Sequence, residues 1–206
     1  MEKQSVLVTL TAPTCAGKSY LLNYIRNDRK LPCLVSTTTR PARAGEVEGV
    51  DYFFISEEES KSLEANDDFA ELAVYNGIRY GVTKAEFKSK LDTGLTFLIV
   101  EPSGIDHYVK PALDVGAKHL KYFVDVDLST RIKRFTARLA EDLSKMDKNT
   151  NLEKFVSASL IRHAAMLQVE PGWVDLVKWD RVLNGNDTPE HNLSLILADV
   201  MMLNHN

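Results

Sequence analysis

The chain alternates between short apolar segments and helical segments, and this order limits the folds that it can adopt. Apolar, β-rich runs at 5–10, 95–100 and 119–126 are typical of buried strands. Helical patterns separate these runs along the chain, and strands that alternate with helices favour an α/β fold with a parallel sheet. The region from 35 to 83 breaks the alternation, which predicts a small strand-rich lobe inserted into that fold.

Shorter segments predict further elements. Runs at 33–36, 51–55 and 178–183 are expected to be strands, the last of them in the core. Runs at 69–75 and 78–80 are expected to pair as a hairpin around Asn76-Gly77, a strong turn signal. Ser56 and Thr83, each followed three residues later by a glutamate, are expected to cap helices.

Composition places the chain among ordinary globular proteins. Its 206 residues are 44% hydrophobic and 26% charged, and the formal net charge is −4 at pH 7. That charge disfavours a nucleic-acid partner bound through bulk positive charge, so any phosphate ligand must be held by local basic groups. Two cysteines, no recognisable signal peptide and no apolar run of membrane-spanning length predict a cytoplasmic protein without a membrane partner.

The first apolar run leads into the loop Ala12 to Ser19 (A-P-T-C-A-G-K-S) and then into a helical pattern. This order resembles the P-loop pattern G-x-x-x-x-G-K-[ST], with Ala12 in place of the first glycine. The backbone amides and helix dipole of such a loop bind phosphates. Lys18 is expected to neutralise the β- and γ-phosphates of a nucleotide, and Ser19 to ligate Mg²⁺. If the loop required a positive φ at Ala12, the alanine would cost about 1 kcal/mol.

Two further segments carry groups suited to phosphate and metal chemistry. The loop from Ser36 to Tyr52 holds Arg40 and Arg43, whose forked guanidinium groups match phosphate oxygens in pairs. An ordinary solvated surface loop is the alternative for this segment. The apolar run at 97–100 ends in Glu101, whose carboxylate would bind the water shell of a metal or a sugar hydroxyl, or would simply face solvent.

With these elements together, the chain resembles guanylate kinase, a P-loop nucleoside-monophosphate kinase, over almost its whole length. The most specific part is S-T-T-T-R-P-A-R-A-G-E-V-E-G-V-D-Y at 36–52. It matches the family pattern S-x-T-T-R-x-P-R-x-G-E-x-x-G-x-D-Y, with the proline moved to directly after Arg40. The resemblance implies a single domain over 1–206, with a P-loop NTPase-type parallel sheet core flanked by helices. It would comprise a core (1–34, 84–127 and 170–206), a monophosphate-binding lobe (35–83) and a helical lid (128–169).

The resemblance also implies how a guanine nucleotide is recognised. Glu71, in F-A-E-L-A, would accept the adjacent N1–H and N2–H donors of guanine, and Ser36 would face its O6. Two positions depart from the family. Its Y-G-T becomes Tyr80-Gly81-Val82, and its L-D-x-D-x-Q-G becomes 98–104 with Ile99 and Glu101 at the acidic positions. These departures leave the preference for base and sugar open.

The lid is implied by a shorter match. Arg134 and Arg138, in R-F-T-A-R, correspond to the family's R-L-x-x-R-G, and Arg162 follows on the next helix. Arginines that close over the transferring phosphoryl group stabilise its charge. Their neighbours Arg131 and Lys133 are expected to be solvated helix charges.

The sequence and its resemblance therefore predict Mg²⁺-dependent phosphoryl transfer from ATP to GMP or dGMP, by a monomer or homodimer. The residues implied to be catalytic are Lys18, Arg40, Arg134, Arg138 and Arg162. Those implied to bind ATP are Ala12, Pro13, Thr14, Cys15, Ala16, Gly17, Lys18, Ser19, Tyr20 and, near adenine, Asn184. Those implied to bind GMP are Ser36, Arg40, Arg43, Tyr52, Glu71, Tyr80, Val82 and Glu101. The implied magnesium ligands are Ser19 and, through water, Glu101.

Two other functions compete with this prediction. Val82, Ile99 and Glu101 are also compatible with a kinase of the same fold that accepts another or a modified deoxynucleoside monophosphate. Alternatively, guanylate-kinase-like domains of membrane-associated scaffold proteins bind phosphorylated peptides without catalysis. Such domains typically lose the phosphate loop, so the presence of Lys18 and Ser19 here disfavours the scaffold.

Overall fold

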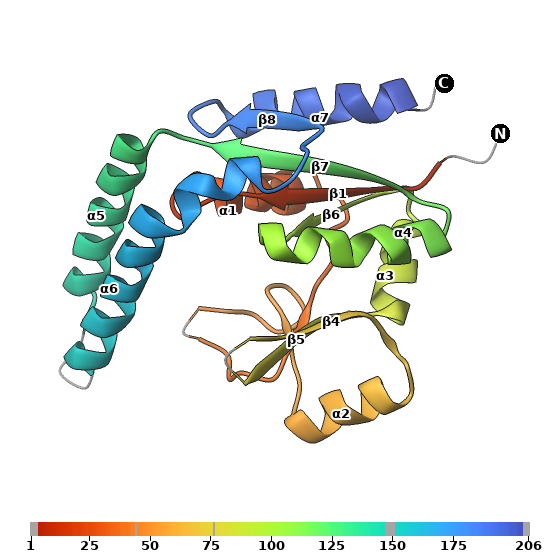
Figure 1. The fold of residues 1–206 in the computed structure, drawn as a ribbon, viewed down its shortest axis with the longest axis horizontal. Coiled ribbons are helices and arrows are strands. Elements are labelled where there is room, and N and C mark those ends of the chain that lie inside the picture. The colour runs from red at the N-terminus through yellow and green to blue at the C-terminus, as the bar shows by residue number, and fades with distance from the viewer. Residues whose placement is uncertain (1–3, 44, 76, 147–150, 204–206) are drawn as a thin grey trace.

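The computed structural model describes residues 4–43, 45–75, 77–146 and 151–203. Figure 1 shows a central sheet, a strand-containing lobe on one side of it, and a pair of long helices at one end. The sheet has four strands, and all three neighbouring pairs are parallel, which confirms the predicted α/β class. Its strands, in order across the sheet, are β6 (Leu95–Ile99), β1 (Val6–Thr11), β7 (Lys118–Asp125) and β8 (Arg181–Asn184).

β1 is buried along its whole length because helices cover both faces of the sheet. Successive side chains of a strand point to opposite faces, so Val6, Val8 and Leu10 join one apolar cluster while Leu7 joins the other. The first cluster packs under α1 (Lys18–Asn23), the π-helical turn η1 (Tyr24–Asp28) and α7 (Pro189–Leu203). The second packs under α3 (Lys84–Leu91), the 3₁₀ segment η2 (Pro102–Tyr108) and α4 (Val109–Asp114).

The lobe has a second sheet, which lies below the core in Figure 1 together with helix α2 (Glu57–Ala65). Its strands, in order, are β3 (Phe53–Phe54), β2 (Thr37–Thr38), β5 (Ile78–Thr83) and β4 (Phe69–Tyr75). The predicted antiparallel pairing of the two longer strands is confirmed, although Asn76 of the predicted turn lies outside the described residues. Both predicted helix caps are also confirmed, since Ser56 and Thr83 accept from the amides of Glu59 and Glu86.

The long helices are α5 (Leu128–Ser144) and α6 (Leu152–Gln168), and the 3₁₀ segment η3 (Glu170–Asp175) returns the chain to the core. Helix α5 begins where the side chain of Asp127 accepts from the amide of Thr130 at 2.9 Å. An aspartate at this position satisfies a backbone donor that the first helical turn leaves unpaired. Within the described part of the chain, no helix is long and apolar enough to cross a membrane.

Three predicted segments were wrong in extent. The expected strand at 33–36 is reduced to a bridge between Cys33 and Phe97, because the chain then leaves the core sheet to enter the lobe. The strand expected at 51–55 contains only Phe53–Phe54. The last core strand begins at Arg181 rather than at 178, since the Asp180 carboxylate accepts the amide of Lys121 where the ladder would otherwise start.

A buried histidine in the sheet leads to a prediction about stability. Nε2 of His119 lies 2.9 Å from Oγ1 of Thr9, and its Nδ1 is buried without a hydrogen-bond partner among the described residues. Burial, reinforced by the charge of Lys121, lowers the pKa of His119 from 6.5 to about 4. Between those values the unfolded chain binds a proton that the folded chain does not, so the free energy of unfolding should decrease as pH falls through this window.

Between pH 6.5 and about 4, the free energy of unfolding should fall by about 2 kcal/mol more in the wild type than in His119→Gln. This figure is reduced to allow for the partial solvent exposure of His119. Urea unfolding at a series of pH values measures the difference. His191→Gln, at an exposed histidine, is the control and should keep the wild-type slope. An identical slope in His119→Gln and wild type would contradict the assignment.

Candidate active site

The carboxyl ends of the parallel strands meet at one edge of the core sheet, and a cavity of about 770 Å³ opens there. The loop after β1, Glu101 after β6 and the loop after β8 all line it. Ligands of open α/β sheets bind at this edge, because the loops that follow parallel strands gather there. The cavity also receives Arg43 from the lobe, Arg134 and Arg138 from α5, and Arg162 from α6.

The phosphate loop takes its shape from two residues with left-handed backbone. Cys15 has φ 62° and Gly17 has φ 104°, immediately before α1 begins at Lys18. Ala12 has no positive φ and is 2% exposed, so the predicted strain at this position is absent. The replacement of the family's first glycine therefore carries no backbone cost here, because the special conformation falls at Cys15 instead.

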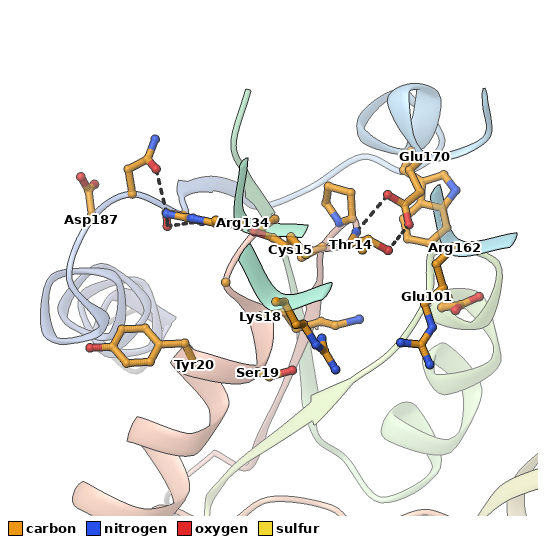
Figure 2. A pocket seen from close by; sticks show the side chains of 18 of the residues that line it. Thr14, Cys15, Lys18, Ser19, Tyr20, Glu101, Arg134, Arg162, Glu170 and Asp187 are labelled. Carbon is orange, nitrogen blue, oxygen red and sulfur yellow. Dashed lines mark hydrogen bonds between the residues drawn. The ribbon is translucent and has the colours of Figure 1, made fainter. Parts of the chain in front are cut away.

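Lys18 and Ser19 occupy the start of α1, where backbone amides and the helix dipole favour anions. Burial lowers the pKa of Lys18, while the charges of Glu101 and Glu170 act in the opposite direction. In the view of Figure 2, Glu101 and Arg162 lie on one side of Lys18, and Arg134, Tyr20 and Asp187 lie on the other. The lysine thus stands between two groups of polar side chains that come from different elements.

Two side chains in the cavity carry oxygen atoms suited to bind a magnesium ion together with the phosphates of a nucleotide. Ser19 and Glu101 line the same cavity and supply hydroxyl and carboxylate oxygens, the kind of ligand that Mg²⁺ prefers. Among the described residues, no group of three or more His, Cys, Asp or Glu side chains could hold a metal ion. This arrangement fits an ion that keeps several waters and binds chiefly through its substrate phosphates.

On the lobe, Arg40, Tyr52 and Tyr80 lie together, whereas Arg43 faces the cavity. Arg40 is 8% exposed and donates to both carboxylate oxygens of Glu46 at 2.6 Å. The pair raises the pKa of Arg40 and lowers that of Glu46 to about 2. Glu46 also accepts from the amide of Arg43 at 2.7 Å, so one carboxylate fixes both arginine positions in the loop.

Glu71 has two partners that the sequence did not reveal. Its carboxylate accepts from the hydroxyl of Tyr108 at 2.9 Å and lies 3.3 Å from Nδ1 of His107. Both residues belong to η2, which follows β6 and gave no clear helix signal. Val82 is completely buried in the second apolar cluster, and neither Ser36 nor Glu71 lines the cavity. The contacts of Ser36, Glu71 and Val82 with a base therefore stay predictions.

Arg134 links α5 to both loops at the edge of the sheet. Its guanidinium donates to the carbonyls of Cys15 and Gly185 at 3.3 Å and to Oδ1 of Asn186 at 3.0 Å. Asn184 does not line the cavity, because its side chain closes the turn to Asn186 and Asp187. The neighbouring residues 185–187 line it instead, and the proposed contact between Asn184 and adenine stays a prediction.

The two other arginines predicted for the lid, Arg138 and Arg162, are both exposed, whereas their neighbour Arg131 is buried. Arg138 is largely exposed. The pKa of Arg162 is lowered by the neighbouring side chains that displace solvent and by the charges of Arg138 and Arg43. Lys133 is exposed as expected, but the same expectation for Arg131 was wrong. Arg131 is 3% exposed and pairs with Glu170, a residue that sequence reasoning missed because it lies 39 positions away in another element.

A phosphate loop at the edge of a parallel sheet, faced by arginines from a lobe and from a helical pair, defines the class of P-loop phosphotransferases. Residues 4–170 match the sequence profile of the family described as guanylate kinase. The chain is 31% identical over 184 residues to the guanylate kinase of Fusobacterium nucleatum, with 88% of each chain covered. It is 41% identical over 100 residues to that of Pseudoalteromonas translucida, with 48% of each covered.

A solved structure shares the fold. The crystal structure of guanylate kinase from Anaplasma phagocytophilum superposes with a TM-score of 0.60 at 21% identity, covering 98% of this chain and 89% of that one. The chain belongs to the guanylate kinase family, as its resemblance predicted. It is therefore a nucleoside-monophosphate kinase, a phosphotransferase, and the prediction of an enzyme is confirmed.

Gly185 leads to a prediction about the nucleotide edge of the cavity. A Cβ atom at this position would lie 2.1 Å from the carbonyl oxygen of Ala16 and 2.6 Å from Val126. Gly185→Ala must therefore push the loop after β8 away from the phosphate loop. We expect a loss of about 2 kcal/mol in unfolding free energy, typical of overpacking, together with weaker ATP binding. Thermal unfolding and calorimetric titration with ATP measure the two effects.

Gly172→Ala is the matched control, because a Cβ there meets nothing within 4 Å. It should keep both properties of the wild type. Wild-type stability and ATP affinity in Gly185→Ala would contradict the claim that close approach of the two loops shapes the site.

Proposed function

We propose that this enzyme transfers the γ-phosphoryl group of ATP to GMP or dGMP, with Mg²⁺, to yield ADP and GDP or dGDP. The observation that carries the proposal is the meeting of Lys18 and Ser19 with Arg43 in one cavity. The phosphate loop, which is expected to bind ATP, and a guanidinium from the motif at 36–52 therefore face the same space. The family membership and the names of the curated relatives support the same reaction.

The donor would be held by the loop amides and by Lys18, with Mg²⁺ bound through Ser19 and, through water, Glu101. The acceptor phosphate would be held by Arg43, with Arg40, Tyr52 and Tyr80 behind it. Tyr52 lies 4.9 Å from the guanidinium carbon of Arg40, measured to its ring centroid, and its ring meets that of Tyr80 edge-on at 6.2 Å between centroids. The Tyr52 ring and the Glu46 carboxylate would together hold Arg40 in place behind Arg43.

The reaction needs alignment and charge neutralisation rather than a strong base or a covalent intermediate. An oxygen of the acceptor phosphate attacks the γ-phosphorus, and the bond to the bridging oxygen breaks with its electron pair left on ADP. Arg134, Arg138 and Arg162 would stabilise the negative charge shared by the transferring group. Closure of the helical pair over the cavity would also exclude water and so limit wasteful hydrolysis of ATP.

A shifted acceptor specificity is the second candidate, and the contacts of Glu71 favour it. Its carboxylate is engaged by Tyr108 and His107, whereas the proposed guanine contact needs two acceptor positions on the same group. Val82 also leaves no hydroxyl at its position, and its side chain is buried. A base that requires only one acceptor from Glu71 would disturb these contacts less.

The acceptor clamp predicts a distinctive kinetic change. Arg43→Ala should raise KM for the monophosphate and lower kcat, because a guanidinium that binds acceptor phosphate is lost in both the ground state and the transition state. We expect KM to rise about tenfold while the affinity for ATP stays within about twofold. Steady-state assays with each substrate varied measure both values. Arg29→Ala, at an exposed arginine outside the cavity, is the control, and wild-type kinetics for Arg43→Ala would reject the clamp.

A panel of monophosphates decides between the two candidate acceptors. With ATP and Mg²⁺ at fixed concentrations, we expect GMP and dGMP to give kcat/KM at least about a hundredfold above AMP, CMP and dTMP. The reason is that a site built to pair with guanine leaves its own polar groups unpaired when another base binds. Coupled detection of ADP measures each rate. Poor turnover of both guanine nucleotides beside efficient turnover of another or a modified deoxynucleotide would establish the shifted specificity instead.

A further inference from the structure

One buried carboxylate joins the phosphate loop to the base of the helical pair. Glu170, at the start of η3, is 5% exposed. It accepts from the amide of Thr14 at 2.9 Å and from the Thr14 hydroxyl at 2.5 Å. Figure 2 shows these two bonds at the cavity wall. The same carboxylate accepts from Arg131 of α5 at 3.1 Å, and this arginine also donates to the carbonyl of Met166 in α6 at 3.0 Å.

Packing alone does not explain this arrangement. Burying an ion pair gains little stability over apolar side chains of similar volume, because both charges lose their hydration. Here the carboxylate performs a task that an apolar group cannot, since it satisfies both donors of Thr14. The bonds fix the residue that precedes Cys15, where the backbone turns into its left-handed conformation.

The charge of Glu170 also matters for a nearby anion. Its carboxylate lines the cavity and acts electrostatically on Cys15 and Lys18. If it were unpaired, the negative charge of Glu170 in the cavity wall would repel the phosphates of a nucleotide. Arg131 neutralises this charge by donating to Oε2, the same oxygen that accepts from the Thr14 amide, so the loop gains two hydrogen bonds without the cost of an uncompensated anion.

We propose that Glu170 is a positioning residue for the phosphate loop and that Arg131 makes its charge compatible with a bound nucleotide. The pair holds Thr14 in place for the donor and ties the loop to the two helices that carry the lid arginines. Binding of the donor and the position of the helices are thereby coupled. The proposal rests on the proposed function only in taking ATP as the donor, since it makes no assumption about the acceptor.

The test is the affinity for ATP with Mg²⁺ in the absence of any acceptor, measured by calorimetry on the full chain. Thr14→Val removes the hydroxyl donor at nearly constant volume and should weaken ATP binding about tenfold, the usual scale for a hydrogen bond to a charged group. Thr14→Ser restores the donor and should return to within about threefold of the wild type. Because no acceptor is present, an error in the proposed acceptor leaves this result unchanged.

A double-mutant cycle tests the role of the charge. Arg131→Leu leaves Glu170 unpaired and should weaken ATP binding at least about tenfold. Adding Glu170→Gln removes the stranded charge, so the double variant should bind ATP more tightly than Arg131→Leu alone. Arg181→Leu removes an ion pair with Asp199 outside the cavity, and this control should change the melting temperature without changing ATP affinity.

Glu170→Gln alone should also weaken ATP binding, because it removes the charged acceptor of the Thr14 hydrogen bonds. Unchanged ATP affinity in both Thr14→Val and Glu170→Gln would overturn the proposal, and these two variants keep it testable if Arg131→Leu fails to fold. Loss of ATP affinity that merely follows the melting temperature in every variant, Arg181→Leu included, would also overturn it, because a purely structural pair would behave in that way. Weaker ATP binding in Thr14→Val with a wild-type melting temperature, reversed in Thr14→Ser, would support it.

Discussion

The organisation of this enzyme depends on positive charge that is gathered around one cavity. Lys18, Arg43, Arg134, Arg138 and Arg162 come from four separate elements or loops and line the same space. Loss of hydration lowers the pKa values of both Lys18 and Arg162, and the neighbouring charges of Arg138 and Arg43 lower that of Arg162 further. A ligand with several negative charges relieves both effects. The cavity is therefore best suited to a polyphosphate ligand, as the proposed function requires.

The parallel sheet makes this concentration of charge possible. Because every core strand runs in the same direction, the loops after β1, β6 and β8 emerge at one edge. Buried side chains on both faces of β1 anchor that edge in the core. The lobe and the helical pair then need only bring arginines toward a fixed loop. Glu170 and Arg131 contribute to this arrangement, because their buried hydrogen bonds attach α5 and α6 to the phosphate loop.

Features set by local sequence could be predicted, and features set by distant contacts could not. The loop before Lys18, the caps at Ser56 and Thr83 and the burial of β1 all follow from neighbouring residues. The ion pair between Arg131 and Glu170 could not be predicted in this way. An arginine in a helix with charged neighbours is expected to face solvent, and only the folded structure brings Glu170 next to it. Likewise, Tyr108 reaches Glu71 only through the packing of η2 against the lobe.

A bisubstrate analogue would show whether the donor and acceptor phosphates occupy one cavity, as the proposed function requires. In such a molecule adenosine and guanosine are joined by a chain of five phosphates. Calorimetric titration of the full chain should show one molecule bound per protein, with an affinity far above that of ATP or GMP alone, because linking two ligands makes the second contact intramolecular. Binding should be competitive with both nucleotides. An affinity no higher than that of ATP, with no competition from GMP, would show that the two phosphates do not share this cavity.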